Sequence, residues 1–345
     1  MADVLIRTDA SSQIGMGHAM RCLALAEELA QRGHRPIFIS KDLPGIILRE
    51  LKTLQLSHVL LDSGLTLNQE LERLPGILSS LVSPVVAITD GYAFDETYQA
   101  WLKSRVDLLI CLDDLAVNRF DCHAVLNQNL GFGEKDYQTL TAAGTTLFIG
   151  PKFSLLRASY RAAAGSHMVR LEPQRILISM GGGDRFDMTY KALCELAPLE
   201  GVEIDIILGP AYAHDDPIRR LRPKAYARMH LHTEVLDLTR FILQADVVIC
   251  PSGSTVWQIA CLGAPLITFP LIDNQAGIAM GLYAERAAVV IDPDWREGDL
   301  RRITSDLLNH VEWRQNLSGR SKQIVDGHGV VRITDWIESR MLQRG

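Results

Sequence analysis

The sequence predicts an α/β protein with two doubly wound domains, each built on a parallel sheet, that face each other across a cleft. The chain has 345 residues, which at about 150 residues per domain favours two domains, although one large barrel also fits the length. Short runs rich in Val, Ile and Leu alternate with longer amphipathic stretches, a pattern typical of βα units around a buried parallel sheet. Because such folds bind ligands at the carboxyl ends of their strands, we expect the ligand site in the cleft.

The first series of βα units occupies the N-terminal half. Its predicted strands are residues 4–8, 35–40, 58–61, 85–89 and 108–112. The stretch 18–31 is predicted to be a helix, because its apolar residues fall mostly on one face. Gly33 follows this stretch and is predicted to end the helix.

The second series begins after a stretch rich in Gly, Pro and Ser, residues 131–173, which we expect to be loop-rich. Its predicted strands are residues 175–180, 204–208, 247–250, 266–269 and 288–291, its predicted helices are residues 255–262 and 274–285, and residues 300–343 show only helical patterns. With a connection near 162–173, we expect an N-terminal domain over 1–162 and a C-terminal, nucleotide-binding domain over 173–325.

The composition of the chain limits the kinds of partner that it can bind. Thirty-five Lys and Arg against 41 Asp and Glu give a net charge of −6, which argues against a nucleic-acid partner. Six cysteines without a Cys-x-x-Cys pair are typical of buried thiols in a reducing compartment. With no secretory signal and no apolar run of about 18 residues, we expect a cytoplasmic protein without a membrane span. We also expect a monomer.

Asp113 and Asp114 end a predicted strand, but neighbours on a strand point to opposite faces, so we expect no metal site there. We expect no cofactor either.

The most informative segment joins the first strand to the first helix and reads Arg7-Thr-Asp-Ala-Ser-Ser-Gln-Ile-Gly-Met-Gly-His18. Gly15 and Gly17 let the backbone approach a ligand closely, and the helix start offers free N–H groups to an anion. Met20 stands where a dinucleotide fingerprint would need its third glycine, and no phosphate-binding Gly-Lys-Ser/Thr loop follows. His18 is a candidate general base near neutral pH; the alternative is a histidine that only caps or packs the helix.

Two further turns have a similar character. Ser252, Gly253, Ser254 and Thr255 join a predicted strand to a predicted helix, where N–H and O–H groups can bind a diphosphate; the alternative is a plain serine N-cap. A glycine turn around Gly182 also follows a predicted strand. Three such turns at strand ends favour a nucleotide-type ligand.

Several motifs, in order over about 270 residues, resemble one family. They are the segment Arg7 to Ala26, Leu112-Asp-Asp-Leu-Ala116, Leu126-Asn-Gln-Asn-Leu130, Gly150-Pro-Lys-Phe-Ser-Leu-Leu-Arg157, Met180-Gly-Gly-Gly-Asp184, Ser252-Gly-Ser-Thr-Val-Trp-Gln258 and Asp273-Asn-Gln275. The sequence resembles the UDP-sugar hydrolases of pseudaminic acid biosynthesis, which act on a UDP-activated diacetamido-trideoxy-altropyranose, and the related spore-coat polysaccharide proteins. The resemblance implies the glycosyltransferase-B architecture of two Rossmann-like domains, with a last helix over 326–345 that packs back on the N-terminal domain.

The resemblance also implies a reaction and its residues. Water, rather than a sugar or lipid, would accept the glycosyl group from UDP, and His18 would match the family's base. The residues expected to bind substrate or nucleotide are Gly15, Gly17, Tyr92, Arg157, Gly182, Ser252, Gly253, Ser254, Thr255, Gln258, Asn274 and Gln275. Two positions depart from the family pattern: Gln258 replaces the family's glutamate, and Gly91 replaces a polar residue before Tyr92.

We therefore expect an inverting hydrolysis at the anomeric carbon, with one base and a good leaving group instead of the carboxylate pair of ordinary glycosidases. Two other functions stay open: a glycosyltransferase that uses a UDP-sugar donor, and a non-catalytic nucleotide-sugar binding protein. Release of UDP without an acceptor, release that depends on an acceptor, and binding without turnover separate the three.

Overall fold

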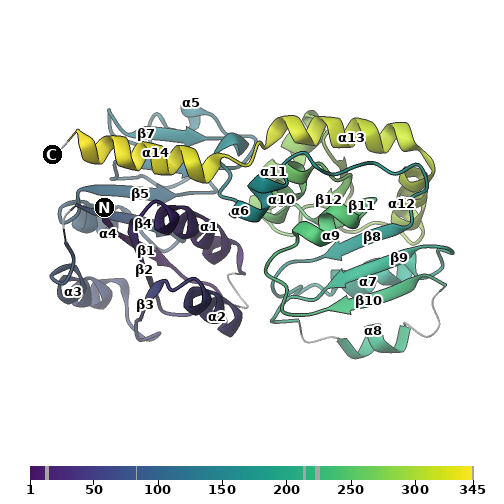
Figure 1. Ribbon diagram of the computed structural model, residues 1–345, viewed down its shortest axis with the longest axis horizontal. Coiled ribbons are helices and arrows are strands. Elements are labelled where there is room, and N and C mark those ends of the chain that lie inside the picture. The colour runs from purple at the N-terminus through teal and green to yellow at the C-terminus, as the bar shows by residue number, and fades with distance from the viewer. Residues whose placement is uncertain (12–14, 83, 213–214, 222–225, 344–345) are drawn as a thin grey trace. The chain divides into compact units, whose positions relative to one another are not determined.

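The computed structural model describes residues 1–11, 15–82, 84–212, 215–221 and 226–343. The chain forms two compact units: unit 1 consists of Met1–Ala158 and His328–Gly345, and unit 2 consists of Ser159–Gly327. Each unit contains one parallel sheet flanked by helices (Figure 1). The prediction of an α/β chain with two parallel sheets is confirmed, and the single barrel is wrong.

The sheet of unit 1 has seven strands in the order β3-β2-β1-β4-β5-β6-β7. The strands are β1 (Asp3–Thr8), β2 (Arg35–Ser40), β3 (Ser57–Leu60), β4 (Val85–Asp90), β5 (Leu108–Leu112), β6 (Ala124–Asn127) and β7 (Thr146–Ile149). The chain winds in one direction from β1 to β3 and in the other from β4 to β7. The carboxyl ends of β1 and β4 are thus a topological switch point, where doubly wound sheets bind ligands.

Helices connect these strands. They are α1 (Gly17–Gln31), α2 (Gly45–Thr53), α3 (Leu67–Leu78), α4 (Glu96–Lys103), α5 (Glu134–Tyr137) and the short 3₁₀ helix η1 (Pro151–Phe153). The last helix of the chain, α14 (Gly329–Leu342), also belongs to unit 1 and packs on α1 and η1. Gly329 permits this packing, because a Cβ at this position would collide with the carbonyl oxygen of Ser154.

The sheet of unit 2 has six strands in the order β10-β9-β8-β11-β12-β13, with a switch point between β8 and β11. The strands are β8 (Arg175–Ser179), β9 (Glu203–Ile207), β10 (Arg228–His232), β11 (Val247–Pro251), β12 (Leu266–Phe269) and β13 (Val289–Val290). Its helices are α6 (Ala158–Ala162), α7 (Met188–Leu196), α8 (Asp215–Leu221), α9 (Thr239–Gln244), α10 (Thr255–Leu262), α11 (Asp273–Ala284), α12 (Asp299–Asn309) and α13 (Val311–Ile324).

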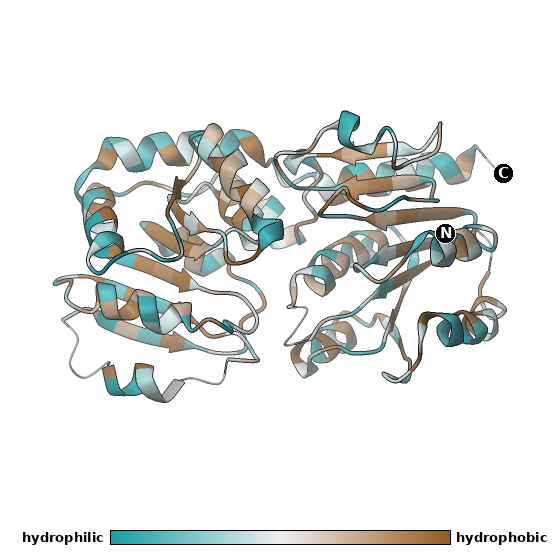
Figure 2. Ribbon diagram, turned by 180° about the vertical axis from the view of Figure 1, so that it is seen from behind, coloured by the Kyte–Doolittle hydropathy of each residue, from teal (hydrophilic) through white to brown (hydrophobic). Residues whose placement is uncertain are grey.

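Apolar side chains explain why the central strands form. Every residue of β1, β5 and β11 is buried, and the central strands of both sheets are strongly apolar (Figure 2). Strands that are covered on both faces have no solvent-exposed side, so their sequences are continuous apolar runs. The central strands were therefore predicted close to their observed bounds.

Three strands, β6, β7 and β10, were not predicted. The expectation of a loop-rich stretch over 131–173 is wrong in part, because β7 lies inside it and pairs with β6 at the edge of the sheet. The predicted strand 288–291 is shortened to the two residues of β13. Within the described residues, no helix is both long and apolar enough to span a bilayer.

Candidate functional site

The turn between β1 and α1 keeps the amino end of α1 open. Gly15 adopts a φ of 86°, a left-handed conformation that favours glycine. Met16 occupies the N-cap position without a side-chain cap, and the first turn of α1 contains no acidic residue. Residues 12–14 of the predicted turn lie outside the described residues. The first amides of α1 thus face no capping carboxylate of their own helix, as an anion site requires.

His18, in the first turn of α1, lies between two carboxylates. Its Nε2 is 3.5 Å from Oδ2 of Asp114, and its Nδ1 is 3.7 Å from Oδ1 of Asp90. The side chain is 10% exposed, and the edge of the Tyr92 ring packs against it at a centroid distance of 5.0 Å. Among the described residues, Nδ1 has no hydrogen-bond partner. The ring is therefore oriented by electrostatic and aromatic contacts more than by a fixed hydrogen bond.

Arg21 lies one turn further along α1 and joins the same two carboxylates. Its guanidinium donates to both oxygens of Asp90 at 2.6 and 2.7 Å and to both oxygens of Asp114 at 2.7 and 2.9 Å. Burial disfavours the charged carboxylates, but the Arg21 charge outweighs this effect and lowers the pKa of both Asp90 and Asp114. One guanidinium and two carboxylates together carry a net charge of −1 beside His18.

The ends of neighbouring strands supply the rest of this cluster. Asp90 ends β4, Asp114 follows β5, and Asn129 follows β6. The amide of Asn129 donates to Asp114 at 2.9 Å, and the Tyr92 hydroxyl donates to the same carboxylate at 3.2 Å. We call His18, Arg21, Asp90, Asp114 and Asn129 the His18 cluster.

Sequence reasoning assigned roles to His18 and Tyr92, weighed Asp114 only as a metal ligand, and gave no role to Arg21, Asp90 or Asn129. The available signal was positional, because polar residues that end adjacent parallel strands converge at one edge of the sheet. Asp113 has other partners and accepts a hydrogen bond from the Tyr137 hydroxyl at 2.6 Å. No group of three or more His, Cys, Asp or Glu placed to hold a metal is found in the part of the chain that the structure describes.

Arg157 lies between acidic residues of two helices. Its guanidinium contacts Glu27 of α1 at 3.1 Å and Glu50 of α2 at 2.7 Å. Its charge is therefore neutralised within unit 1. Arg157 therefore joins α1 to α2 through two ion pairs, and its expected part in substrate binding stays a prediction.

In unit 2, the turn between β11 and α10 has one buried and several accessible positions. Ser252 is fully buried, and its hydroxyl contacts that of Thr268 on β12 at 2.9 Å. Ser254 occupies the N-cap position of α10 but makes no capping hydrogen bond with its side chain, so the plain N-cap interpretation is wrong. Gly253, Ser254 and Thr255 are half-buried. Ser252 thus joins two strands, whereas Ser254 and Thr255 keep hydroxyls that a ligand can reach.

Two amide side chains border this turn. Gln275 of α11 accepts a hydrogen bond from the Leu271 backbone at 2.9 Å, and its Nε2 would lie 3.6 Å from a Cβ at Gly253. Asn274 precedes it in the first turn of α11 and is half-buried. On α10, Gln258 accepts a hydrogen bond through Oε1 from the Tyr160 hydroxyl at 3.2 Å. The carbonyl of Gln258 is thus engaged within unit 2, which leaves its Nε2 as a donor.

The third glycine turn differs from the other two. Both carboxylate oxygens of Asp184 accept hydrogen bonds, from the backbone of Met188 and of Thr189, at 2.8 Å each. The Gly182 carbonyl accepts from the Ala211 backbone at 3.0 Å. Because Asp184 accepts from the first two amides of α7, these two amides are not open to an anion.

Comparisons with known proteins agree with this architecture. The crystal structure of MurG from Acinetobacter baumannii superposes with a TM-score of 0.67 at 16% identity, covering 98% of this chain and 100% of MurG. The chain therefore has the two-domain α/β fold of glycosyltransferase-B proteins, as predicted.

Two curated relatives match most of the chain. The spore coat polysaccharide biosynthesis protein SpsG of Bacillus subtilis is 22% identical over 354 residues, which is 95% of this chain and 96% of SpsG. The UDP-2,4-diacetamido-2,4,6-trideoxy-beta-L-altropyranose hydrolase of Campylobacter jejuni is 22% identical over 284 residues, which is 81% of this chain and 95% of the hydrolase. No protein-family model matches the sequence.

Proposed function

We propose that the protein is an enzyme that acts on a UDP-sugar in the biosynthesis of a surface polysaccharide or of a nonulosonic acid of the pseudaminic type. Its proposed reaction is hydrolysis of a UDP-activated diacetamido-trideoxy sugar. The observation that carries the proposal is the position of His18 between two carboxylates at the switch point of the first sheet. The names of the Bacillus and Campylobacter relatives support the substrate class.

In the proposed reaction, His18 accepts a proton from water while the water oxygen bonds to the anomeric carbon. The bond between that carbon and the diphosphate oxygen breaks, and its electron pair leaves with UDP. Proton transfer brings the charge of the His18 cluster from −1 to zero, so Asp90 and Asp114 stabilise the imidazolium as it forms. Arg21 and Asn129 hold these carboxylates in place.

Unit 2 is proposed to bind the nucleotide. The amino end of α10 offers backbone N–H groups and the hydroxyls of Ser254 and Thr255 to a diphosphate. These donors would stabilise the charge that grows on the leaving group. Gly253 would keep the turn open, and Asn274, Gln275 and Gln258 would border the bound nucleotide.

Incubation of the purified protein with the UDP-activated diacetamido-trideoxy sugar, without an acceptor, tests the proposal. We expect UDP release, and we expect His18→Ala to lower kcat by about 10²–10⁴-fold with KM nearly unchanged, the range for a lost general base. His230→Ala, on edge strand β10, is the matched control and should keep wild-type turnover. Wild-type turnover in a folded His18→Ala variant would show that His18 only packs the helix.

The fold also favours a second candidate, because the chain shares its architecture with MurG over nearly its whole length. A glycosyltransferase would release UDP slowly on its own and rapidly when a sugar or lipid acceptor is added. Release that depends on an acceptor supports this candidate against the hydrolase.

A further inference from the structure

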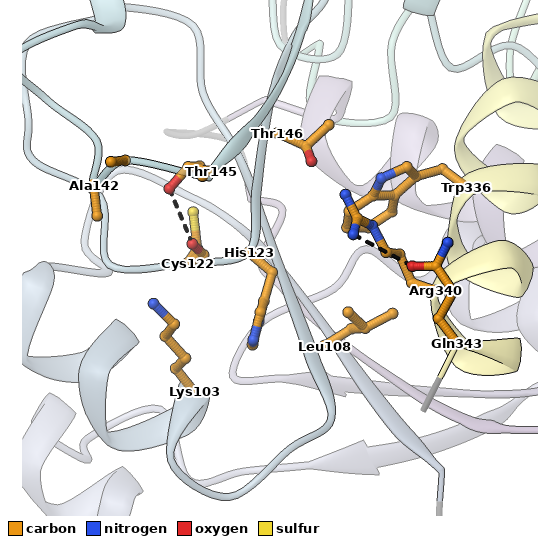
Figure 3. Close-up of a pocket in the computed structure, with 12 residues that line it drawn as sticks. Lys103, Leu108, Cys122, His123, Ala142, Thr145, Thr146, Trp336, Arg340 and Gln343 are labelled. Carbon is orange, nitrogen blue, oxygen red and sulfur yellow. Dashed lines mark hydrogen bonds between the residues drawn. The ribbon is translucent and has the colours of Figure 1, made fainter. Parts of the chain in front are cut away.

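Unit 1 contains a pocket of about 400 Å³ at the edge of its sheet opposite the His18 cluster. Its walls come from the amino ends of β5, β6 and β7, from the end of α4 and from the second half of α14 (Figure 3). The His18 cluster lies at the carboxyl ends of the strands. We call this hollow the α14 pocket; its polar lining side chains are Lys103, His123, Thr145, Thr146, Trp336, Arg340 and Gln343.

The charged groups that line the α14 pocket are basic. None of its lining residues is Asp or Glu. Arg340 stacks over the Trp336 ring, 5.6 Å from the ring centroid, and contacts the Gln343 amide at 3.5 Å. Within the residues that the structure describes, no carboxylate forms an ion pair with Arg340, whereas Lys103 is paired with Asp121 at 2.7 Å. Arg340 is exposed to solvent, and no carboxylate of the described residues neutralises its positive charge.

Two ring side chains, His123 and Trp336, line the pocket. The Leu109 backbone donates to Nδ1 of His123 at 2.9 Å, which fixes the orientation of this ring at the pocket wall. Trp336 is held edge-on by Phe148 at a centroid distance of 5.4 Å, and its buried Nε1 has no acceptor among the described residues. A buried donor without an acceptor is unfavourable, so an oxyanion that reaches Nε1 of Trp336 would supply the acceptor that the described residues do not.

We propose that the α14 pocket binds a small phosphorylated molecule, with its phosphate group near Arg340 and Trp336. A guanidinium pairs with two oxygens of a phosphate at once, and the Trp336 N–H can donate to a third. Small-molecule sites occupy about 300–1,000 Å³, so this pocket has room for a sugar-sized group beside the phosphate. Thr145, Gln343 and His123 are placed to hydrogen-bond that group.

Calorimetric titration with glucose 6-phosphate, inorganic phosphate and glucose tests the proposal. The wild type should bind glucose 6-phosphate at this site more tightly than phosphate, and glucose should not bind. Arg340→Gln removes a charged donor and should weaken binding of glucose 6-phosphate about tenfold or more. Lys103→Gln should weaken it less, because Asp121 already shares the Lys103 charge.

The matched control is Arg105→Gln, which removes an arginine that also stacks over a tryptophan, Trp101, at 4.0 Å, but lies outside the pocket. It should bind like the wild type. Ser254→Ala separates this site from the proposed nucleotide turn of unit 2. Equal affinity in Arg340→Gln and the wild type, or a loss confined to Ser254→Ala, would overturn the proposal. The result does not depend on whether the protein hydrolyses UDP-sugars.

Discussion

Arg21 turns two distant carboxylates into one buried ionic cluster. Asp90 and Asp114 lie 69 and 93 positions further along the chain, and all three side chains are nearly inaccessible to solvent. A buried charge is tolerated only when its partners are present. The geometry around His18 is therefore also a condition of stable folding.

Stability in acid should report on this cluster. Because the pKa values of Asp90 and Asp114 are lowered in the folded protein, their contribution is fully present above the unfolded value of about 4. It is lost as the pH falls toward their folded values, since the unfolded chain then binds protons that the folded chain does not. Denaturant unfolding between pH 7 and pH 2 should show this steep loss.

A matched pair of variants assigns the effect to Asp114. Asp114→Asn should lower the free energy of unfolding at pH 7 by about 3–5 kcal/mol, as expected when a buried ion pair loses one partner. The free energy of unfolding of this variant should also fall less steeply as the pH is lowered. Asp335→Asn removes a carboxylate that is 60% exposed and paired with Arg32, and should cost less than about 1 kcal/mol. Equal costs in the two variants would contradict the buried cluster.

Gln258 gives a second prediction at the scale of the residue. In Gln258→Glu, one carboxylate oxygen keeps the hydrogen bond from Tyr160, and the other becomes a charged acceptor for a ribose hydroxyl. We expect UDP to bind more tightly by about 0.5–1.5 kcal/mol, or up to about tenfold in Kd. Calorimetric titration with UDP measures the change. Equal or weaker binding would place Gln258 outside the ribose contact.

Among the candidate residues, sequence reasoning identified those that chain-local patterns mark. His18 was found because two glycines precede it, and the β11–α10 turn was found because its hydroxyls follow an apolar strand. Arg21 was missed because a basic residue in an amphipathic helix is usually solvent-exposed. Its burial depends on Asp90 and Asp114, and only the three-dimensional fold brings these partners to it.

At the scale of the element, the two serines of the β11–α10 turn should behave differently. Ser252→Ala removes a buried hydroxyl contact between β11 and β12, and should cost about 1–2 kcal/mol of stability while leaving UDP affinity unchanged. Ser254→Ala should leave stability within about 0.5 kcal/mol and weaken UDP binding about tenfold. Thermal unfolding and UDP titration of both variants check this. The reverse pattern would mean that Ser252, not Ser254, contacts the nucleotide.

The elements that the sequence did not predict lie mostly at sheet edges. β10 alternates apolar Met229 and Leu231 with Arg and His on its other face, so it lacks the continuous apolar run that marks a central strand. β7 has only four residues and follows a glycine turn. An edge strand takes part of its stability from the neighbouring strand. The hydrophobic pattern of the edge strand alone does not show that this neighbour exists.

At the scale of the whole molecule, the proposed chemistry is divided between the two units. Unit 1 contains His18, the proposed base, with its two carboxylates, and unit 2 contains the turn proposed to bind the nucleotide. Both units have a parallel sheet with a switch point. The His18 cluster and the β11–α10 turn each lie where strands of these sheets end. The alternation of βα units predicted this twofold plan, whereas the reaction depends on side chains that the shared fold does not specify.

The measurement that tests the central claim most directly is hydrolysis of the UDP-activated diacetamido-trideoxy sugar in ¹⁸O-labelled water, followed by mass spectrometry of both products. Attack of water at the anomeric carbon predicts one ¹⁸O atom in the free sugar and none in UDP, with the anomeric configuration inverted in the product first formed. Label in UDP would mean attack at phosphorus and would contradict the role proposed for His18.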